Sequence, residues 1–169
     1  MKLIEAMKKL KDLNIKAEDL RKKVGQHCAD LNVETALYPD QKGTIDGWIQ
    51  AHHDLLKEIL RLRTAIQRTN IVTSVTIELG GVQVTKNIAG WIHRRRDLAK
   101  LEMAMWQQLG DRGLREGMAQ NSQQQQIEIR IRRYFDPKLR DERLEQYRSE
   151  PSTIDGTLEV TNAVTDLME

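Results

Sequence analysis

Two stretches in the first 70 residues repeat a seven-residue pattern of apolar positions separated by mostly charged ones. In the first stretch the repeat positions are Leu3, Ala6, Leu10, Leu13, Ala17, Leu20 and Val24. In the second they are Ile45, Trp48, His52, Leu55, Ile59, Leu62, Ile66 and Thr69. This heptad pattern predicts two amphipathic helices, over about 2–24 and 44–70, that pair along one stripe.

The segment between these helices, residues 25–43, is rich in turn-forming residues and is predicted to be a loop. Gly25 is expected to end the first helix and Thr44 to cap the second. Because helices of equal length joined by a loop run antiparallel, residues 1–70 are predicted to form an antiparallel coiled-coil hairpin. Apolar residues beside the seam need a third helix or another subunit to cover them. These flanking residues are Ile4, Met7, Ile15, Ile49 and Leu56.

Residues 71–86 carry the pattern of a β-hairpin. Positions 72–79 are mostly β-branched, Gly80 and Gly81 supply a two-residue turn, and a return strand starts at Val82. A two-stranded hairpin is marginally stable alone, so we expect it to pack on helices or to join another sheet.

The next part of the chain predicts a helix over 87–109, followed by a flexible connection over 110–126 that contains a run of four glutamines. The apolar stripe of this helix is expected to comprise Ile88, Trp91, Ile92, Leu98, Leu101, Met105 and Leu109. Residues 127–132 alternate isoleucine with charged residues, which predicts one extra strand with one apolar face.

The last part of the chain predicts a helix and an acidic tail. Asp136 followed by Pro137 is typical of a helix start, and Pro151 is expected to stop that helix. Residues 152–169 fit a short helix or an extended segment equally well. The whole chain is therefore predicted to be a single domain, 1–169, with a mainly α fold of the α+β class.

A short motif occurs twice, as Thr-Asn-Ile-Val-Thr at 69–73 and as Thr-Asn-Ala-Val-Thr at 161–165. Both copies follow a predicted helix. Asn tolerates left-handed backbone geometry and Thr can bond to nearby backbone. We therefore interpret the motif as two similar helix-ending turns, in preference to a duplicated active site.

The composition excludes several classes of protein. One cysteine excludes a disulfide scaffold, and no 18-residue apolar run is available to span a membrane. Aromatic residues make up 4% of the chain, which leaves few side chains to line a deep substrate pocket. Met1 leads directly into a charged helix with no apolar leader, so a cytoplasmic location is expected, or a virion if the protein is phage-encoded.

The formal net charge of +2 conceals an uneven distribution. Residues 86–149 carry 14 basic and 9 acidic side chains, whereas residues 150–169 carry 5 acidic and no Lys or Arg residues. One interpretation is that the acidic tail neutralises the basic middle, within the fold or between subunits. The other is that the basic middle contacts phosphate groups of a nucleic acid.

Six arginines are the candidate phosphate contacts: Arg94, Arg95, Arg96, Arg130, Arg132 and Arg133. Arg130 and Arg132 are expected on one face of the predicted strand, next to an aromatic pair, which is an arrangement that could hold RNA or phosphate. The alternative is that these arginines face solvent or meet acidic residues of a neighbouring subunit.

No motif predicts catalysis, a cofactor or a metal. His52 and His53 are adjacent and so point about 100° apart on a helix, which prevents them from binding one ion together. Cys28 and His27 are neighbours in sequence but lack an orienting third group. We therefore predict no catalytic residues, no cofactor, no metal site and no small-molecule substrate.

The chain resembles the septicolysin-like family of small bacterial proteins in three short motifs. Its first helix opens with Lys-Leu-x-Glu-Ala at 2–6, its second ends with Ile-x-x-Thr-Asn at 66–70, and Arg-Arg-Asp-Leu at 95–98 is close to a family motif that has one more residue before the Leu. The resemblance implies a helical-hairpin fold that oligomerises and has no established enzymatic role.

The predicted function is therefore a non-enzymatic, oligomeric structural or assembly protein, with partners that are copies of itself or other assembly subunits. The nine seam residues Leu3, Leu10, Leu13, Leu20, Trp48, His52, Leu55, Ile59 and Leu62 are expected to form the core or an oligomer contact. A nucleic-acid-binding module that uses the arginines is the alternative.

Overall fold

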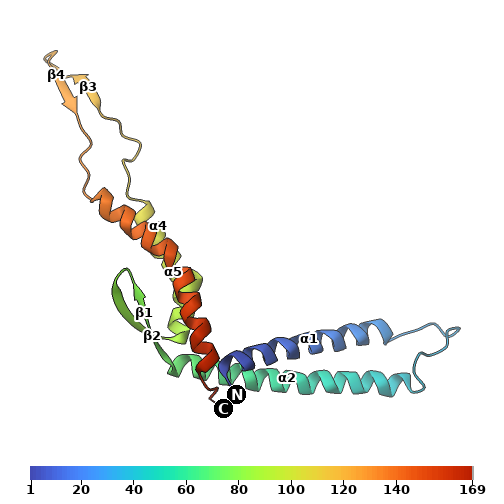
Figure 1. Cartoon of the computed structure of the whole chain (residues 1–169). Coiled ribbons are helices and arrows are strands. Elements are labelled where there is room, and N and C mark those ends of the chain that lie inside the picture. The colour runs from blue at the N-terminus through green and yellow to red at the C-terminus, as the bar shows by residue number, and fades with distance from the viewer. Residues whose placement is uncertain (169) are drawn as a thin grey trace. The chain divides into compact units, whose positions relative to one another are not determined.

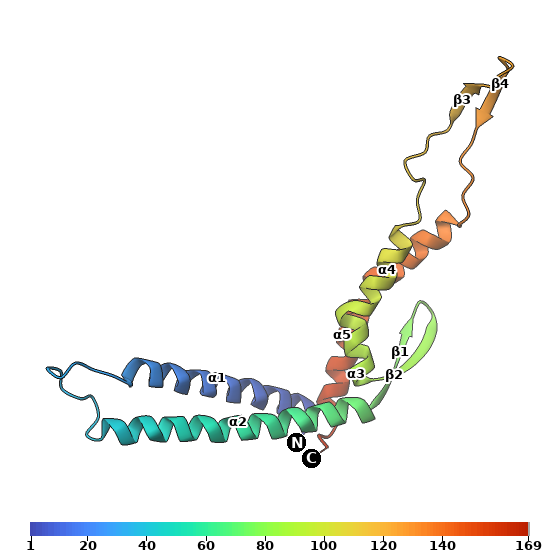
Figure 2. The same cartoon turned by 180° about the vertical axis from the view of Figure 1, so that it is seen from behind.

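The computed structural model describes residues 1–168 and has a mainly helical α+β fold, as predicted (Figures 1 and 2). In chain order its elements are α1 (Leu3–His27), α2 (Gln41–Val72), β1 (Ser74–Leu79), β2 (Val82–Asn87), α3 (Ile88–His93), the π-helix η1 (Arg94–Leu98), α4 (Ala99–Gln107), β3 (Gly117–Gln120), β4 (Gln126–Ile129) and α5 (Pro137–Val164).

The sequence predicts a single domain, whereas the chain divides into two compact units. Each unit is built from separate segments of the chain. The first unit comprises Met1–Val75, Asn87–Ala89 and the residues from Leu158 onward. The second comprises Thr76–Lys86 and Gly90–Thr157.

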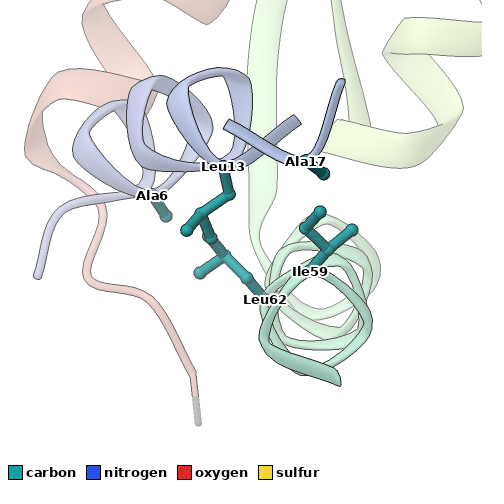
Figure 3. Packing of buried hydrophobic residues seen from close by; sticks show 5 residues of the cluster. All are labelled: Ala6, Leu13, Ala17, Ile59 and Leu62. Atoms are coloured by element: carbon teal, nitrogen blue, oxygen red, sulfur yellow. The ribbon is translucent and has the colours of Figure 1, made fainter. Parts of the chain in front are cut away.

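Helices α1 and α2 of the first unit run side by side as the predicted hairpin (Figure 1). Ala6, Leu13 and Ala17 of α1 point toward Ile59 and Leu62 of α2, and all five are buried (Figure 3). These residues occupy heptad positions, so the core of this pair follows the heptad stripe.

The predicted ends of these two helices are wrong by a few residues. Gly25 does not end α1, which continues to His27 and is followed by Cys28 in right-handed helical geometry. Thr44 does not cap α2, because Asp40 does: its carboxylate accepts the backbone N–H of Gly43 at 2.8 Å. A side chain three residues before an unpaired N–H is an ordinary N-cap, so α2 gains one more turn at its start.

The β1–β2 hairpin is confirmed. Gly80 and Gly81 both have positive φ, at 57° and 79°, which is the backbone that a two-residue hairpin turn requires. The Thr76 and Thr85 hydroxyls bond to each other at 2.7 Å across the strands. Val75 and Ile77, on one side of β1, are buried, at 8% and 3% exposed.

The repeated Thr-Asn-x-Val-Thr motif ends helices α2 and α5 in the same way. The N–H of Thr73 donates to the carbonyl of Thr69, and that of Thr165 donates to the carbonyl of Thr161, each at 2.9 Å. This confirms the interpretation as two similar helix-ending turns. After each motif the chain becomes extended and pairs with the residues that precede another helix.

The two pairings have the same form. The carbonyl of Thr73 accepts the N–H of Ile88, the first residue of α3, at 3.0 Å. The carbonyl of Thr165 accepts the N–H of Leu3, the first residue of α1, at 2.9 Å. Beyond it, Lys2 and Asp166 form an antiparallel bridge, which ties the two terminal segments together.

Thr69 fixes the C-terminal segment to α2. Its side chain is fully buried, donates to the carbonyl of Ala65 at 2.9 Å and accepts the N–H of Met168 at 2.9 Å. We expect Thr69→Val, which keeps the shape, to lower the free energy of unfolding by about 1–2 kcal/mol, because the Met168 N–H loses its acceptor. Urea unfolding tests this, with Thr153→Val as control, because the exposed Thr153 hydroxyl bonds only to a carbonyl of its own helix. A Thr69→Val protein as stable as the parent would contradict the assigned bond.

The predicted helix over 87–109 corresponds to α3, η1 and α4, but its predicted stripe is only half buried. Ile88 and Trp91 are buried, whereas Leu98, Leu101 and Met105 are 47%, 65% and 71% exposed. The π-helix explains this correction, since its wider turn rotates every later residue relative to an α-helical stripe. A regular 3.6-residue period therefore fails beyond Arg94.

The flexible connection predicted over 110–126 contains a strand. Residues 117–120 form β3, which pairs antiparallel with β4, from Gly117 opposite Ile129 to Gln120 opposite Gln126. The strand predicted over 127–132 is correspondingly shorter, because β3 offers no partner beyond Ile129. All four β4 residues are exposed, so the apolar face predicted for this strand is not covered.

The start of α5 is confirmed, and its predicted end is wrong. The Asp136 carboxylate accepts the N–H of Lys138 at 2.9 Å. The helix does not stop near Pro151 but continues to Val164, so most of the segment left open in the sequence is helical. Glu150 and Ile154, 1% and 0% exposed, anchor the helix on either side of the proline, and this packing outweighs the lost backbone bond.

Candidate functional site: one apolar face of the helical hairpin

The predicted seam residues lie along the α1–α2 pair, and each of them is at least half-buried. Leu3, Leu13, Ile59 and Leu62 are buried. The half-buried members are Leu10, Leu20, Trp48, His52 and Leu55. These side chains therefore fill the inside of the hairpin, and a surface for another chain must be sought beside them.

One side of the pair is polar. Lys9 Nζ lies 2.6 Å from Glu58 Oε1, so this ion pair crosses from α1 to α2. Lys16 and Lys23 follow Lys9 at seven-residue intervals and lie along the same side of α1. We call this side of the hairpin the polar face.

The other side of the pair is apolar. Arg63 Nη2 donates to Asn14 Oδ1 at 3.3 Å. This contact joins α2 to α1 on the side opposite to the Lys9–Glu58 ion pair. Met7 lies seven residues before Asn14, and Leu56 and Ile49 lie seven and fourteen residues before Arg63. Residues seven apart lie on the same side of a helix, so these three side chains lie on the same side of the hairpin as Asn14 and Arg63. Met7, Leu56 and Ile49 are 47%, 45% and 52% exposed.

A shallow groove of about 690 Å³ follows α1 on this side. Its wall includes Ile15, which is 50% exposed, together with Lys11 and Glu18. We call the surface defined by Met7, Asn14, Ile15, Ile49, Leu56 and Arg63 the apolar face. The sequence identified four of these residues as flanks that need a cover, and within the described residues they lie open.

An aromatic cluster lies near the loop end of the hairpin. The rings of His27, Tyr38 and Trp48 are 5.5–5.9 Å apart between centroids, and Lys23 Nζ is 6.0 Å from the Trp48 centroid. The rings pack edge-on or tilted against one another, which is how aromatic clusters stabilise a fold. This cluster therefore explains why Trp48 occupies a seam position.

The three arginines Arg94, Arg95 and Arg96 meet carboxylates of this same chain. Arg94 donates two bonds to Glu150, at 2.9 and 3.0 Å, Arg95 donates to Asp155 at 2.9 Å, and Arg96 lies 3.4 Å from its neighbour Asp97. Glu150 and Asp155 belong to the acidic tail, so their pairs confirm that the tail neutralises part of the basic middle within the fold.

The other three arginines follow β4, which ends at Ile129, so Arg130 and Arg132 are not on the strand face on which they were expected. Arg133 forms a two-bond pair with Asp111, both at 2.7 Å, and Arg130 pairs with Glu128 at 2.9 Å. Arg132 is stacked 5.4 Å from the Tyr134 ring. Because the arginines are directed at several separate partners, they do not converge on one phosphate-sized position.

Arg94 sits at the start of the π-helix between two glutamates. Besides Glu150, its Nη1 lies 2.7 Å from Glu102, which also accepts the hydroxyl of Tyr147 at 2.9 Å. Burial lowers the pKa of Arg94, but the hydrogen bonds with Glu150 and Glu102 outweigh burial and raise it. The guanidinium therefore stays charged, and the cluster locks α4 and α5 in register. The sequence missed Glu150, since nothing local marks it as buried.

Acid should destabilise the protein through its paired carboxyl groups. The hydrogen bond from Arg94 lowers the pKa of Glu102 below its ordinary 4.5, and that from Arg133 lowers the pKa of Asp111 below 3.8. A carboxyl with a lowered folded pKa stabilises the protein above its ordinary pKa, and this stabilisation is lost as the pH falls through the folded pKa. We expect the free energy of unfolding to be level above about pH 5 and to fall below it.

Urea titrations at a series of pH values measure this dependence. Glu102→Gln should show a shallower fall in stability with acid than the parent, because one of the lowered carboxyl groups is gone. An unfolding free energy that rises between about pH 5 and about pH 3 would contradict the assigned pairs.

The residues considered for catalysis are not arranged as a reactive group. His52 is half-buried and His53 is exposed. The Cys28 thiol is directed at the carbonyl of Gly25, 3.8 Å away, and the ring of its neighbour His27 lies in the aromatic cluster. Among residues 1–168, no three His, Cys, Asp or Glu side chains are grouped in a way that would hold a metal ion.

Comparison with protein-family models, with curated proteins and with solved structures finds no match for this chain. Over the described part of the chain, no helix combines the length and the hydrophobicity that crossing a bilayer requires.

Proposed function

We propose that the chain is a non-enzymatic structural subunit that assembles with other subunits into a larger protein particle. The observation that carries this proposal is the apolar face of the α1–α2 hairpin. Four large apolar side chains on it, Met7, Ile15, Ile49 and Leu56, are 45–52% exposed. Exposed large apolar side chains gathered on one side of a helix pair are typical of a protein–protein contact.

A second exposed stripe supports the same proposal. Leu98, Leu101 and Met105 are spaced as one side of a helix and are 47–71% exposed. Two apolar surfaces on separate parts of a chain allow a subunit to contact more than one neighbour, as particles require. The resemblance to the septicolysin-like family, whose members are expected to oligomerise, points in the same direction.

The setting we propose is the cytoplasm, or a virion if the gene belongs to a phage. A structural role needs no catalytic group and no bound small molecule. Nucleic-acid binding is the less favoured function, because five of the six candidate arginines have a carboxylate partner in this chain.

Mass measurement of the purified protein in solution tests the proposal. We expect species heavier than the 19.6 kDa chain at micromolar concentration. A substitution that places a charge on the apolar face, Leu56→Asp, should shift the population toward the single chain. Lys16→Asp, at an exposed position of the polar face, should not. A monodisperse single chain across the concentration range would overturn the proposal.

A further inference from the structure

We infer that the partner on the apolar face is a second copy of the same face, packed antiparallel to form a four-helix bundle around a twofold axis beside Ile15 and Leu56. This inference rests on the proposed function, since it names the partner of the surface that carries it. Three properties of the described residues lead to it: the size of the face, its charge pattern and the position of its central apolar residues.

The size of the face suits a stable dimer. Helix α1 has 25 residues and α2 has 32. At 1.5 Å per residue and about 10 Å per helix, the shared face is about 35 Å by about 20 Å, or roughly 700 Å². A standard protein–protein interface buries about 800 Å² on each partner. A second hairpin of the same length would therefore cover the apolar face along its whole length.

The charges nearest Ile15 along the groove are self-complementary. Lys11 lies four residues before Ile15, and Glu18 and Asp19 lie three and four residues after it, and all four line the groove. A twofold axis at Ile15 reverses the direction of α1, so Lys11 of one copy lies opposite Glu18 and Asp19 of the other. Opposite charges facing each other favour this antiparallel register. A parallel arrangement would instead place Lys11 against Lys11.

The half-exposed residues at the centre of the face sit where a twofold axis must pass. Ile15 is the middle residue of α1, and Leu56 is one of the two middle residues of α2. In an isologous contact only residues on the axis meet their own copies. An axis at this level places Ile15 on Ile15 and Leu56 on Leu56, which are apolar pairs of suitable size.

Site-specific crosslinking tests the register directly. In a Cys28→Ser background, Ile15→Cys should form a disulfide-linked dimer on oxidation, because its sulfur would meet the identical sulfur across the axis. Lys16→Cys is the matched control, since it is the adjacent residue but lies on the polar face. The readout is the fraction of crosslinked dimer on a non-reducing gel, expected to be at least about tenfold higher for Ile15→Cys than for Lys16→Cys, because the second pair of sulfurs is too far apart to bond.

Charge reversal provides an independent readout of the same contact. Lys11→Glu and Glu18→Lys should each weaken dimerisation by about tenfold or more, and the double variant should recover most of the loss, because the pair is re-formed with its signs exchanged. Lys16→Glu on the polar face should leave the dissociation constant unchanged. Analytical ultracentrifugation over a dilution series measures these constants.

The outcomes separate this inference from the proposed function. If the parent protein is oligomeric but the Ile15→Cys variant does not crosslink, or crosslinks no better than the Lys16→Cys variant, the antiparallel pairing is overturned while an assembly role stands. If the double charge-reversal variant dimerises as weakly as the single variants, the antiparallel register is likewise overturned. If the parent is a single chain at all concentrations, both the pairing and the proposed function fail.

Discussion

Replacing Arg94 by Met is expected to lower the free energy of unfolding by about 3–5 kcal/mol, the typical cost of leaving a buried charge without its partner. The Glu150 side chain is 1% exposed, and its two carboxylate oxygens accept hydrogen bonds from the Arg94 guanidinium. The Met side chain fills a similar volume, so most of the loss comes from the stranded carboxylate. Chemical unfolding followed by circular dichroism measures it.

The neighbouring arginine supplies the matched control. Arg95 pairs with Asp155 on the surface, where the side chains are 40% and 53% exposed. Arg95→Met should therefore lower the free energy of unfolding much less than Arg94→Met does. Equal effects of the two substitutions would contradict the structural importance assigned to the buried pair.

Leu62→Ala is the second substitution expected to have a large effect, with a loss of about 2–4 kcal/mol. Leu62 is 2% exposed and packs with Leu13 and Ile59 in the seam. Truncation leaves a cavity between two helices that are held together mainly by this stripe. Thermal or urea unfolding of the variant measures the loss.

Leu60→Ala controls for the change in helix propensity. It is the same substitution two residues away, at a side chain that is 67% exposed and points away from α1. Its effect should stay within about 0.5 kcal/mol. If the two variants were equally stable, the α1–α2 seam would not be the main core of this unit.

The hairpin seam and the β1–β2 turn could be predicted because both depend on short-range patterns. A seven-residue repeat determines which stripe of a helix is buried, whatever the partner. Two adjacent glycines at Gly80 and Gly81 permit the positive φ angles of a tight turn that few other residues adopt. Each of these patterns lies within a short segment of the chain, and the elements that they predict are present in the structure.

The ends of helices could not be predicted so well, because local signals compete with packing. Gly25 and Pro151 are both residues that often end helices, yet α1 and α5 continue through them. At Pro151 the buried neighbours Glu150 and Ile154 hold the helix. A propensity of about 1–3 kcal/mol is readily outweighed by burial of such side chains.

The partners of the arginines could not be predicted at all from local sequence. Arg94 and Glu150 are 56 residues apart, and Arg133 and Asp111 are 22 apart. One of the two interpretations of the uneven charge distribution is that basic and acidic segments meet. It did not indicate which residues would meet, since only the fold brings these pairs together.

The antiparallel pairing of residues 1–3 with 165–167 places the first and last segments of the chain side by side. The two ends already lie as neighbouring extended segments, with the N–H of Leu167 donating to the carbonyl of Met1 at 2.9 Å. A short linker would turn them into a hairpin like β1–β2. New termini could then be placed between Gly80 and Gly81, in the β1–β2 turn. The result would be a circular permutant in which no helix is interrupted. If this permutant folds, the fold does not depend on the position at which the polypeptide begins.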